Sequence, residues 1–218
     1  MDTADVVITA RVGTNSPTFA AILAMHVPVG STVADVTFGK GTFWKDVRAD
    51  AYRCLPTDLK ADPPVDLRRL PYADGTIDAV VLDPPYMEGF FRPKKTQTAH
   101  TASDFRDRYA LQGEAEVYGH EAVLRLYADG GREAKRVLRS GGVLIVKCQD
   151  EVSNHRQHLT HVEIVNDYVG IGLYCKDLFV VVRRDTPHGK RMQKQEHARK
   201  NHSYFLVFVK PRARRGEL

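Results

Sequence analysis

Long apolar runs are missing from this sequence: no stretch approaches the roughly 18–20 residues that a membrane-spanning helix needs. The first ten residues contain two acids, where a secretion signal has basic residues. Internal repeats and low-complexity tracts are missing as well. With 218 residues, of which 43% are hydrophobic and 27% charged, the composition is that of an ordinary globular protein. We therefore expect a single domain, residues 1–218, located in the cytoplasm.

Cysteine is scarce. The three cysteines, Cys54, Cys148 and Cys175, lie far apart and form no Cys-x-x-Cys pair, which argues against a disulfide framework or a zinc ribbon. We expect them to behave as small buried hydrophobic residues in a reducing compartment.

Histidines recur at a spacing of three, at His155, His158 and His161. If a helix starts at Asn154, the three side chains project over one broad face. Because no cysteine or acidic cluster accompanies them, we interpret them as a surface face and predict no metal site.

Positive charge exceeds negative charge by five, and the pI is about 9.1. The excess is concentrated late in the chain, where residues 183–202 contain seven lysines and arginines and two acids. Such a run suits a polyanionic partner, although a solvated hairpin is an equally good interpretation.

Apolar segments with strand and helix patterns alternate along the chain, which favours an α/β fold with a mostly parallel sheet. The residues 87–119 form a long polar stretch that we interpret as a mobile or target-contacting insertion. We expect residues 140–142, Ser-Gly-Gly, to stop the second helix. The last two strands, joined by the basic stretch 183–202 as a hairpin connection, indicate one antiparallel member. The pattern predicts helices over 14–25, 120–138 and 160–170, and strands over 33–36, 52–55, 77–82, 143–146, 178–182 and 204–209.

A glycine-rich segment, residues 35–43, follows the first predicted strand of this series. Glycines at such a turn, here Gly39 and Gly41, let a ligand approach the backbone closely at the carboxyl end of a strand. The dinucleotide-binding pattern requires a third glycine at the position of Trp44. Trp44 therefore disfavours a nicotinamide cofactor and leaves room for a nucleoside cofactor without a pyrophosphate.

Two later aspartates are candidate cofactor contacts. Asp58 lies 17 residues beyond Gly41, just after the second predicted strand, where a carboxylate can accept both ribose hydroxyls. A solvated loop aspartate is the alternative. Asp66, before the strand at 77–82, is a weaker candidate for contact with an adenine amino group.

The most specific motif is Asp83-Pro84-Pro85-Tyr86, which directly follows the predicted strand 77–82. The prolines remove two backbone donors and stiffen the turn, so the Pro84 carbonyl and the Asp83 carboxylate become acceptors beside a stacking ring. Two acceptors and an aromatic face suit the exocyclic amino group of a base. A rigid turn with a core tyrosine is the alternative.

An Asp-x-x-x-Gly-x-Gly segment upstream of Asp-Pro-Pro-Tyr resembles the amino-methyltransferases that methylate adenine N6 or cytosine N4 in nucleic acids, in the gamma-type motif order. The resemblance runs from about residue 14 to residue 210, and it is similar to small methylases of phages and bacteria. It implies a Rossmann-like class I methyltransferase fold, a mostly parallel seven-stranded sheet with one antiparallel strand near the C-terminus.

The resemblance also implies the cofactor and the roles of the motif residues. The cofactor is S-adenosylmethionine, and residues 83–86 are the catalytic segment that receives a flipped base. The family usually has Asp-Pro-Phe where this chain has Asp-Val-Thr, so the stacking phenylalanine is missing or moved to Phe38. The implied cofactor contacts are Asp35, Thr37, Phe38, Gly39, Gly41, Asp58 and Asp66.

A separate target-recognition domain is not evident, so residues 87–119 and 183–202 are expected to contact the nucleic acid. We expect adenine N6 in DNA as the target. Cytosine N4 in DNA and adenine N6 in RNA are the alternatives, and a non-catalytic nucleic-acid-binding subunit is an alternative of another class. The candidate phosphate contacts are Arg92, Lys94, Lys95, Lys190, Arg191 and Lys194.

Overall fold

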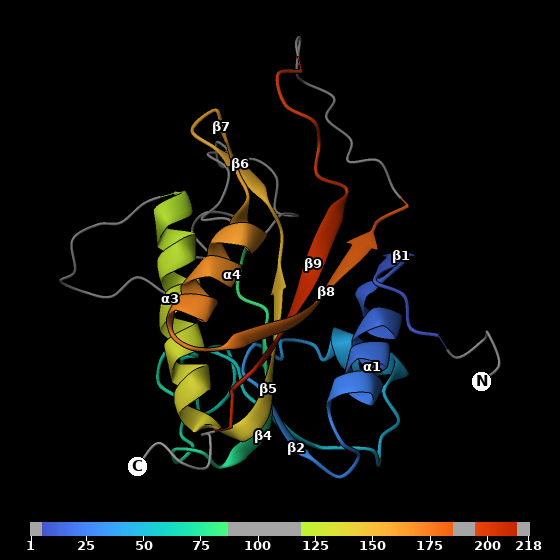
Figure 1. Ribbon diagram of the computed structural model, residues 1–218, viewed down its shortest axis with the longest axis vertical. Helices are drawn as coiled ribbons and strands as arrows, with labels where there is room; N and C mark the ends of the chain where they lie inside the picture. Colours follow the sequence, from blue (N-terminus) through green and yellow to red (C-terminus); the bar gives the residue numbers. More distant parts are fainter. Residues whose placement is uncertain (1–5, 87–118, 185–194, 213–218) are drawn as a thin grey trace.

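The computed structural model describes residues 6–86, 119–184 and 195–212 (Figure 1). Its helices are α1 (Asn15–His26), α3 (His120–Val137) and α4 (Thr160–Gly170), with a short 3-10 helix η2 (Thr42–Asp46). Its strands are β1 (Ala10–Val12), β2 (Thr32–Asp35), β3 (Arg53–Pro56), β4 (Ile77–Leu82), β5 (Leu138–Cys148), β6 (Glu151–Ser153), β7 (Arg156–His158), β8 (Tyr174–Val182) and β9 (His202–Val209).

Seven strands form one sheet in the order β1-β8-β9-β5-β4-β2-β3. Strand β9 runs antiparallel to both of its neighbours, β5 and β8, and the other neighbouring pairs are parallel. This arrangement confirms the expected α/β fold with a mostly parallel, seven-stranded sheet. Strands β2 and β4 are adjacent, so the segments that follow them meet at the same edge of the sheet.

Helices cover both faces of the sheet: α1 lies on one side, and α3 and α4 lie on the other (Figure 1). The central strands are therefore buried on both faces and consist mainly of apolar residues, as parallel strands do. On the α1 side Phe19, Ile22 and Leu23 pack in one core cluster with Val81 and Ile145. The cluster on the other side contains Leu126 and Tyr127 of α3, Tyr168 of α4, and Val80 and Leu82 of β4.

Two glycines inside α3 allow its close packing. A Cβ at Gly131 would lie 2.4 Å from the ring of Tyr168, and one at Gly130 would lie 2.5 Å from Leu67. The Tyr168 hydroxyl donates to the Tyr127 carbonyl at 2.7 Å, which joins α4 to α3. The helix predicted over this glycine pair is confirmed, because close neighbours on two sides compensate for the weak helix propensity of glycine.

The predicted stop at residues 140–142 is wrong. Helix α3 ends at Val137 and β5 starts at Leu138, so the Ser-Gly-Gly segment lies inside the strand. The register between β4 and β5 shifts there, and Gly141 takes a φ of 78°. These glycines form an irregularity in the strand, a conformation that an apolar pattern does not reveal.

Two further elements were not predicted. Strand β1 pairs with β8 at the sheet edge. Strands β6 and β7 form a separate hairpin whose turn residues, Asn154 and His155, have φ values of 50° and 61°. The hypothetical helix start at Asn154 is therefore wrong. Among the described residues, no helix is long and apolar enough to cross a membrane, and the three cysteines are free.

Candidate functional site

The glycine loop, residues 35–43, follows β2 and turns back through two left-handed glycines. Gly39 has a φ of 53° and Gly41 a φ of 64°. The ring of Phe38 covers Gly41, where a Cβ would lie 2.7 Å from the ring Cζ. The backbone nitrogen of Phe38 donates to the Thr57 carbonyl at 3.1 Å, which ties the loop to the end of β3. The left-handed φ of Gly41 thus favours glycine at this position, and the Phe38 ring packs over it.

Asp35 is the buried anchor of this loop, with 3% of its surface exposed. Its carboxylate accepts hydrogen bonds from the indole Nε1 of Trp44 at 2.8 Å and from the backbone nitrogen of Thr37 at 3.2 Å. Burial raises the pKa of Asp35 to about 7, against the lowering effect of these two donors, and the charges of Asp83 and Asp58 raise it further. Sequence reasoning treated Trp44 only as a missing glycine, whereas its indole holds the Asp35 side chain.

Asp58 lies beside the glycine loop. One carboxylate oxygen accepts a hydrogen bond from the backbone nitrogen of Gly39 at 3.2 Å, and the other accepts one from that of Lys60 at 2.8 Å. The side chain is partly exposed. A carboxylate has about four lone-pair positions, so Asp58 keeps acceptor capacity for a ligand at the loop.

Asp66 is engaged with Arg68. The guanidinium donates to both Asp66 oxygens, over 2.7–3.1 Å, and the backbone nitrogen of Arg68 donates at 2.9 Å. Although burial alone would raise the pKa of Asp66, these contacts lower it. Asp66 adjoins Val65, whose nitrogen donates to the Asp58 carbonyl at 3.1 Å. It therefore lies in the same loop system as Asp58, with its carboxylate already bound by a neighbouring cation.

The Asp-Pro-Pro-Tyr loop, residues 83–86, begins directly after β4. The backbone nitrogen of Asp83 donates to Thr37 Oγ1 at 2.7 Å, which joins this loop to the glycine loop. The Tyr86 hydroxyl donates to Oδ1 of Asp83 at 2.6 Å. Burial raises the pKa of Asp83 to about 6, while Tyr86 and the charge of Lys147 lower it. Two segments that lie far apart in the sequence are thus one site.

Lys147 is a residue that sequence reasoning missed. It is 1% exposed at the end of β5, which lies next to β4. The sequence feature that could have pointed to Lys147 is its position as the single charged residue in the apolar run Val143–Cys148.

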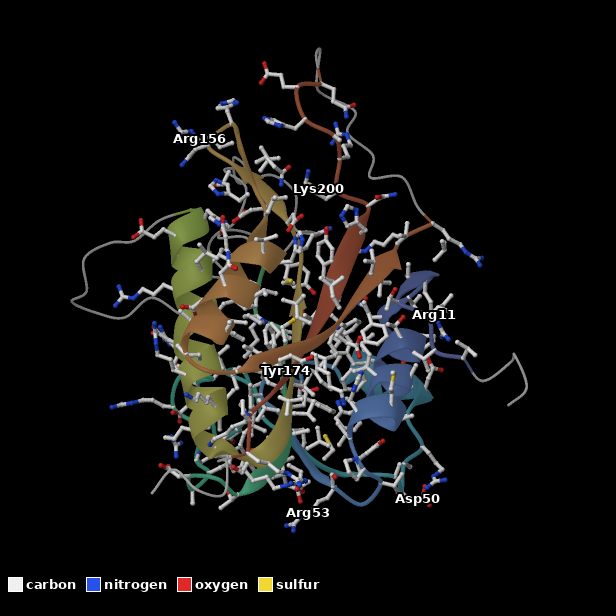
Figure 2. All side chains as sticks on the ribbon, viewed as in Figure 1. Arg11, Asp50, Arg53, Arg156, Tyr174 and Lys200 are labelled. Carbon is white, nitrogen blue, oxygen red and sulfur yellow. The ribbon has the colours of Figure 1, made fainter. Side chains whose placement is uncertain are left out.

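The predicted phosphate contacts, Arg92, Lys94, Lys95, Lys190, Arg191 and Lys194, lie outside the described residues. Other basic side chains do lie at the end of the molecule where the parallel strands finish. Figure 2 shows Arg156 of the β6–β7 hairpin and Lys200 at that end, whereas Arg53, at the start of β3, lies at the opposite end. The Lys200 ammonium donates to Gln157 on the hairpin.

The three regularly spaced histidines have different surroundings and make different contacts. His155 sits on the hairpin turn with its side chain 93% exposed. His158 stacks on His120, with ring centroids 3.8 Å apart. His161 bonds the Asp150 carboxylate through Nδ1 at 2.6 Å and stacks on Tyr204.

One group, His120, His158 and Glu163, has donor atoms close enough to hold a metal ion. However, both ring nitrogens of His120 already contact carboxylates, Glu151 at 2.7 Å and Glu163. Imidazole lone pairs lie in the ring plane, so two rings stacked at an interplanar angle of 26° do not aim them at one point. The arrangement is an ion-paired histidine, held between α3, β6 and α4.

The comparison with protein families finds a match over the second part of the chain. The model of the N6/N4 methyltransferase family, described as DNA methylase, matches residues 77–216, which is more than half of the chain. The match begins with β4 and includes the Asp-Pro-Pro-Tyr loop. A search of proteins with curated functions found no match.

Solved structures with TM-scores above 0.5 share the fold at low sequence identity. A SAM-dependent methyltransferase of Methanosarcina mazei is 10% identical, with a TM-score of 0.53 over 88% of this chain and 97% of that one. TrmN of Thermus thermophilus is 15% identical, with a TM-score of 0.52 over 88% of this chain and 48% of its own. A second Thermus thermophilus protein, provisionally described as a DNA modification methylase, is 19% identical, with a TM-score of 0.43 over 67% and 50%. The chain thus spans about half the length of each Thermus protein.

Proposed function

The chain belongs to the DNA methylase family, and from this premise we propose that it methylates the exocyclic N6 amino group of adenine in DNA with S-adenosylmethionine as the methyl donor. The observation that carries the proposal is the 2.7 Å hydrogen bond from the Asp83 nitrogen to Thr37 Oγ1. It keeps the Asp-Pro-Pro-Tyr loop against the glycine loop, as direct transfer from donor to base requires.

The residues of the glycine loop fit this cofactor. S-adenosylmethionine, when bound, supplies an electrophilic methyl carbon on a positively charged sulfur. The charges of Asp83 and Asp58 both raise the pKa of Asp35, so three carboxylates gather near the ends of three strands, which favours a cationic ligand. Gly39 is exposed, and Asp58 retains acceptor positions for ribose hydroxyls. Trp44 and Thr37 hold the loop on Asp35.

The Asp-Pro-Pro-Tyr loop has the acceptors that an adenine amino group needs. The amino lone pair is delocalised into the ring, so hydrogen bonds to Asp83 and the Pro84 carbonyl help the nitrogen to become pyramidal and to point at the methyl carbon. Orientation and charge stabilisation of this kind lower the barrier without a covalent enzyme intermediate. Tyr86 would stack on the flipped base. An aspartate in the first motif position favours adenine, because serine is commoner there in the related cytosine enzymes.

The target polymer and base are decided by one assay. The purified protein is incubated with methyl-labelled S-adenosylmethionine and either duplex DNA, single-stranded DNA or RNA, and the products are digested to nucleosides. Labelled N6-methyladenine from DNA supports the proposal. Label only in N4-methylcytosine, or only in RNA, refutes the stated target while keeping the reaction class.

The variant Asp83→Ala separates catalysis from cofactor binding. It is expected to lose methyl transfer and to retain S-adenosylmethionine binding, measured by calorimetry. Full activity in this variant would remove Asp83 from the mechanism. No transfer to any polymer by the wild-type protein, together with nucleic-acid binding, would favour the non-catalytic subunit.

A further inference from the structure

Lys147 is a lysine buried in the sheet. It is 1% exposed, its ammonium donates to the hydroxyl of Ser203, and it lies 4.6 Å from the centre of the Phe205 ring. An ammonium has three N–H donors, so one hydrogen bond leaves two unused. Among the described residues no carboxylate lies within ion-pair distance of its Nζ. Burying a charge costs much free energy unless it is compensated, so packing alone does not account for this residue.

The position of Lys147 relates it to Asp83. The parallel register of β4 and β5 pairs Leu82 with Val146, and Asp83 and Lys147 are the next residue on each strand. Val81 lies two residues before Asp83, and Ile145 lies two residues before Lys147. Both belong to the core on the α1 side of the sheet, and residues two apart on a strand point to the same face. Phe205, the cross-strand partner of Lys147, belongs to the same core. The ammonium is thus on the face where the glycine loop and its Trp44 pack.

We propose that Lys147 is a positioning residue that keeps the carboxylate of Asp83 ionised, so that Asp83 can accept hydrogen bonds from the amino group of the target base. This inference deepens the proposed function and rests on it. Lys147 acts through Asp83 and makes no contact with the reacting atoms.

The electrostatics of the pair agree with this role. Burial raises the pKa of Asp83 to about 6, and the positive charge of Lys147 opposes that rise. Burial lowers the pKa of Lys147 to about 8, and the charge of Asp83 opposes that fall. Between these values both groups are charged, and each stabilises the other. Without the ammonium, burial would raise the Asp83 pKa further towards neutrality.

Other groups near the pair do not replace Lys147. The Tyr86 hydroxyl and the thiol of Cys148 stay neutral, because burial raises the pKa of each far above its ordinary range. The pKa of the buried Asp35, about 7, is set by its burial, its own hydrogen bonds and the charges of Asp83 and Asp58. The titratable or charged groups that face Asp83 or Lys147 are Asp35, Tyr86, Tyr127, Cys148 and Arg183.

The decisive experiment titrates Asp83 directly. Protein labelled with carbon-13 at aspartate carboxyls is followed by NMR over pH, with the Asp83 signal assigned by its loss in Asp83→Asn. Lys147→Met, which keeps the side-chain volume and removes the charge, is expected to raise the Asp83 pKa by about 1 unit or more. An unchanged Asp83 titration overturns the proposal, and this readout does not depend on methyl transfer.

The pH profile of methyl transfer gives the second readout. In Lys147→Met the acid limb of kcat is expected to move upward with the Asp83 pKa, so that activity recovers at higher pH. Lys147→Arg, which keeps the charge, is expected to leave the limb near its wild-type position. A loss of kcat by the same factor at every pH would indicate a merely structural role and refute the proposal.

The matched control is Lys210→Met, which makes the same charge change at a partly buried lysine. Lys210 donates to the carbonyls of Lys135 and Leu138. Leu138 is the first residue of β5, so Lys210 lies at the other end of the sheet from Asp83. It is expected to leave the Asp83 titration unchanged. If Lys147→Met does not fold, the ionisation of Lys147 is measured instead in the wild type, by nitrogen-15 NMR over pH. A neutral Lys147 below pH 6 would overturn the inference.

Discussion

The hydroxyl of Tyr86 donates to Oδ1 of Asp83 at 2.6 Å, so the tyrosine occupies one acceptor oxygen of the carboxylate that follows β4. Within the described residues no donor contacts the second oxygen, Oδ2, or the Pro84 carbonyl, so both are candidate acceptors for an amino group. The ring and the hydroxyl of Tyr86 therefore have separable roles in the proposed reaction.

Replacing Tyr86 tests that separation. Tyr86→Phe keeps the stacking ring and is expected to lower kcat/KM by less than about 5-fold, whereas Tyr86→Ala loses a stacking contact of about 1–3 kcal/mol, or about 5–150-fold. Steady-state methylation of a DNA substrate measures both. Equal losses in the two variants would mean that the hydroxyl, and not the ring, matters.

Removing the carboxylate of Asp58 tests the cofactor site. Because charged hydrogen bonds contribute about 1.5–3 kcal/mol, Asp58→Ala is expected to weaken S-adenosylmethionine binding by about 10–150-fold in calorimetry. The control is Asp50→Ala, an exposed aspartate that pairs with Arg48 and precedes β3, whereas Asp58 follows the end of that strand (Figure 2). Equal affinity in the Asp58 variant and the wild type would exclude the ribose contact.

The ion-paired His120 makes stability depend on pH. Although burial lowers its pKa, hydrogen bonds to Glu151 and Glu163 outweigh burial, and the pKa is raised above 6.5. The stabilisation is therefore complete below about pH 6.5 and is lost as pH rises through the higher folded pKa. His120→Asn is expected to lower the free energy of unfolding by about 1–3 kcal/mol at pH 6 and by less at pH 9.

Urea unfolding at the two pH values measures this difference. The control is His155→Asn on the exposed hairpin turn, expected to stay within about 0.5 kcal/mol of the wild type at both. A His120→Asn deficit that grows with pH would contradict the assigned direction.

Filling the contact between α3 and α4 tests the packing. Gly131→Ala places a methyl group 2.4 Å from the Tyr168 ring, and overpacking of this kind costs about 1–3 kcal/mol in unfolding free energy. Gly170→Ala, at the end of α4, meets no atom within 4 Å and is expected to be neutral or to stabilise by up to about 1 kcal/mol. Equal changes in unfolding free energy for the two variants would show that helix propensity, and not the contact with Tyr168, sets the effect of Gly131→Ala.

Elements with a clear local pattern could be predicted from the sequence. The range of β4 was predicted at 77–82 and that of α4 at 160–170, because β-branched runs and helical spacing are local properties. The glycine loop and Asp83 lie together because both end neighbouring parallel strands, an adjacency that the structure shows and local patterns do not specify. The short β1 depends on pairing with β8, which a three-residue pattern cannot specify.

Side-chain partners could not be predicted in the same way. The bond from Trp44 to Asp35, the pairing of Arg68 with Asp66 and the burial of Lys147 are set by the tertiary arrangement. The spacing of the histidines predicted one common helix face. The structure instead has a two-residue turn between β6 and β7, so the histidines contact different neighbours. Residue types and motifs supplied the candidate site residues, and packing decided which of their atoms meet.

If the glycine loop holds the methyl donor and the Asp-Pro-Pro-Tyr loop holds the target base, as proposed, the contact between Thr37 and Asp83 would link the two binding events. A ligand that moves either loop would alter the hydrogen bond that they share. In such a linkage the methyl donor and the target base must change each other's binding affinity by the same factor.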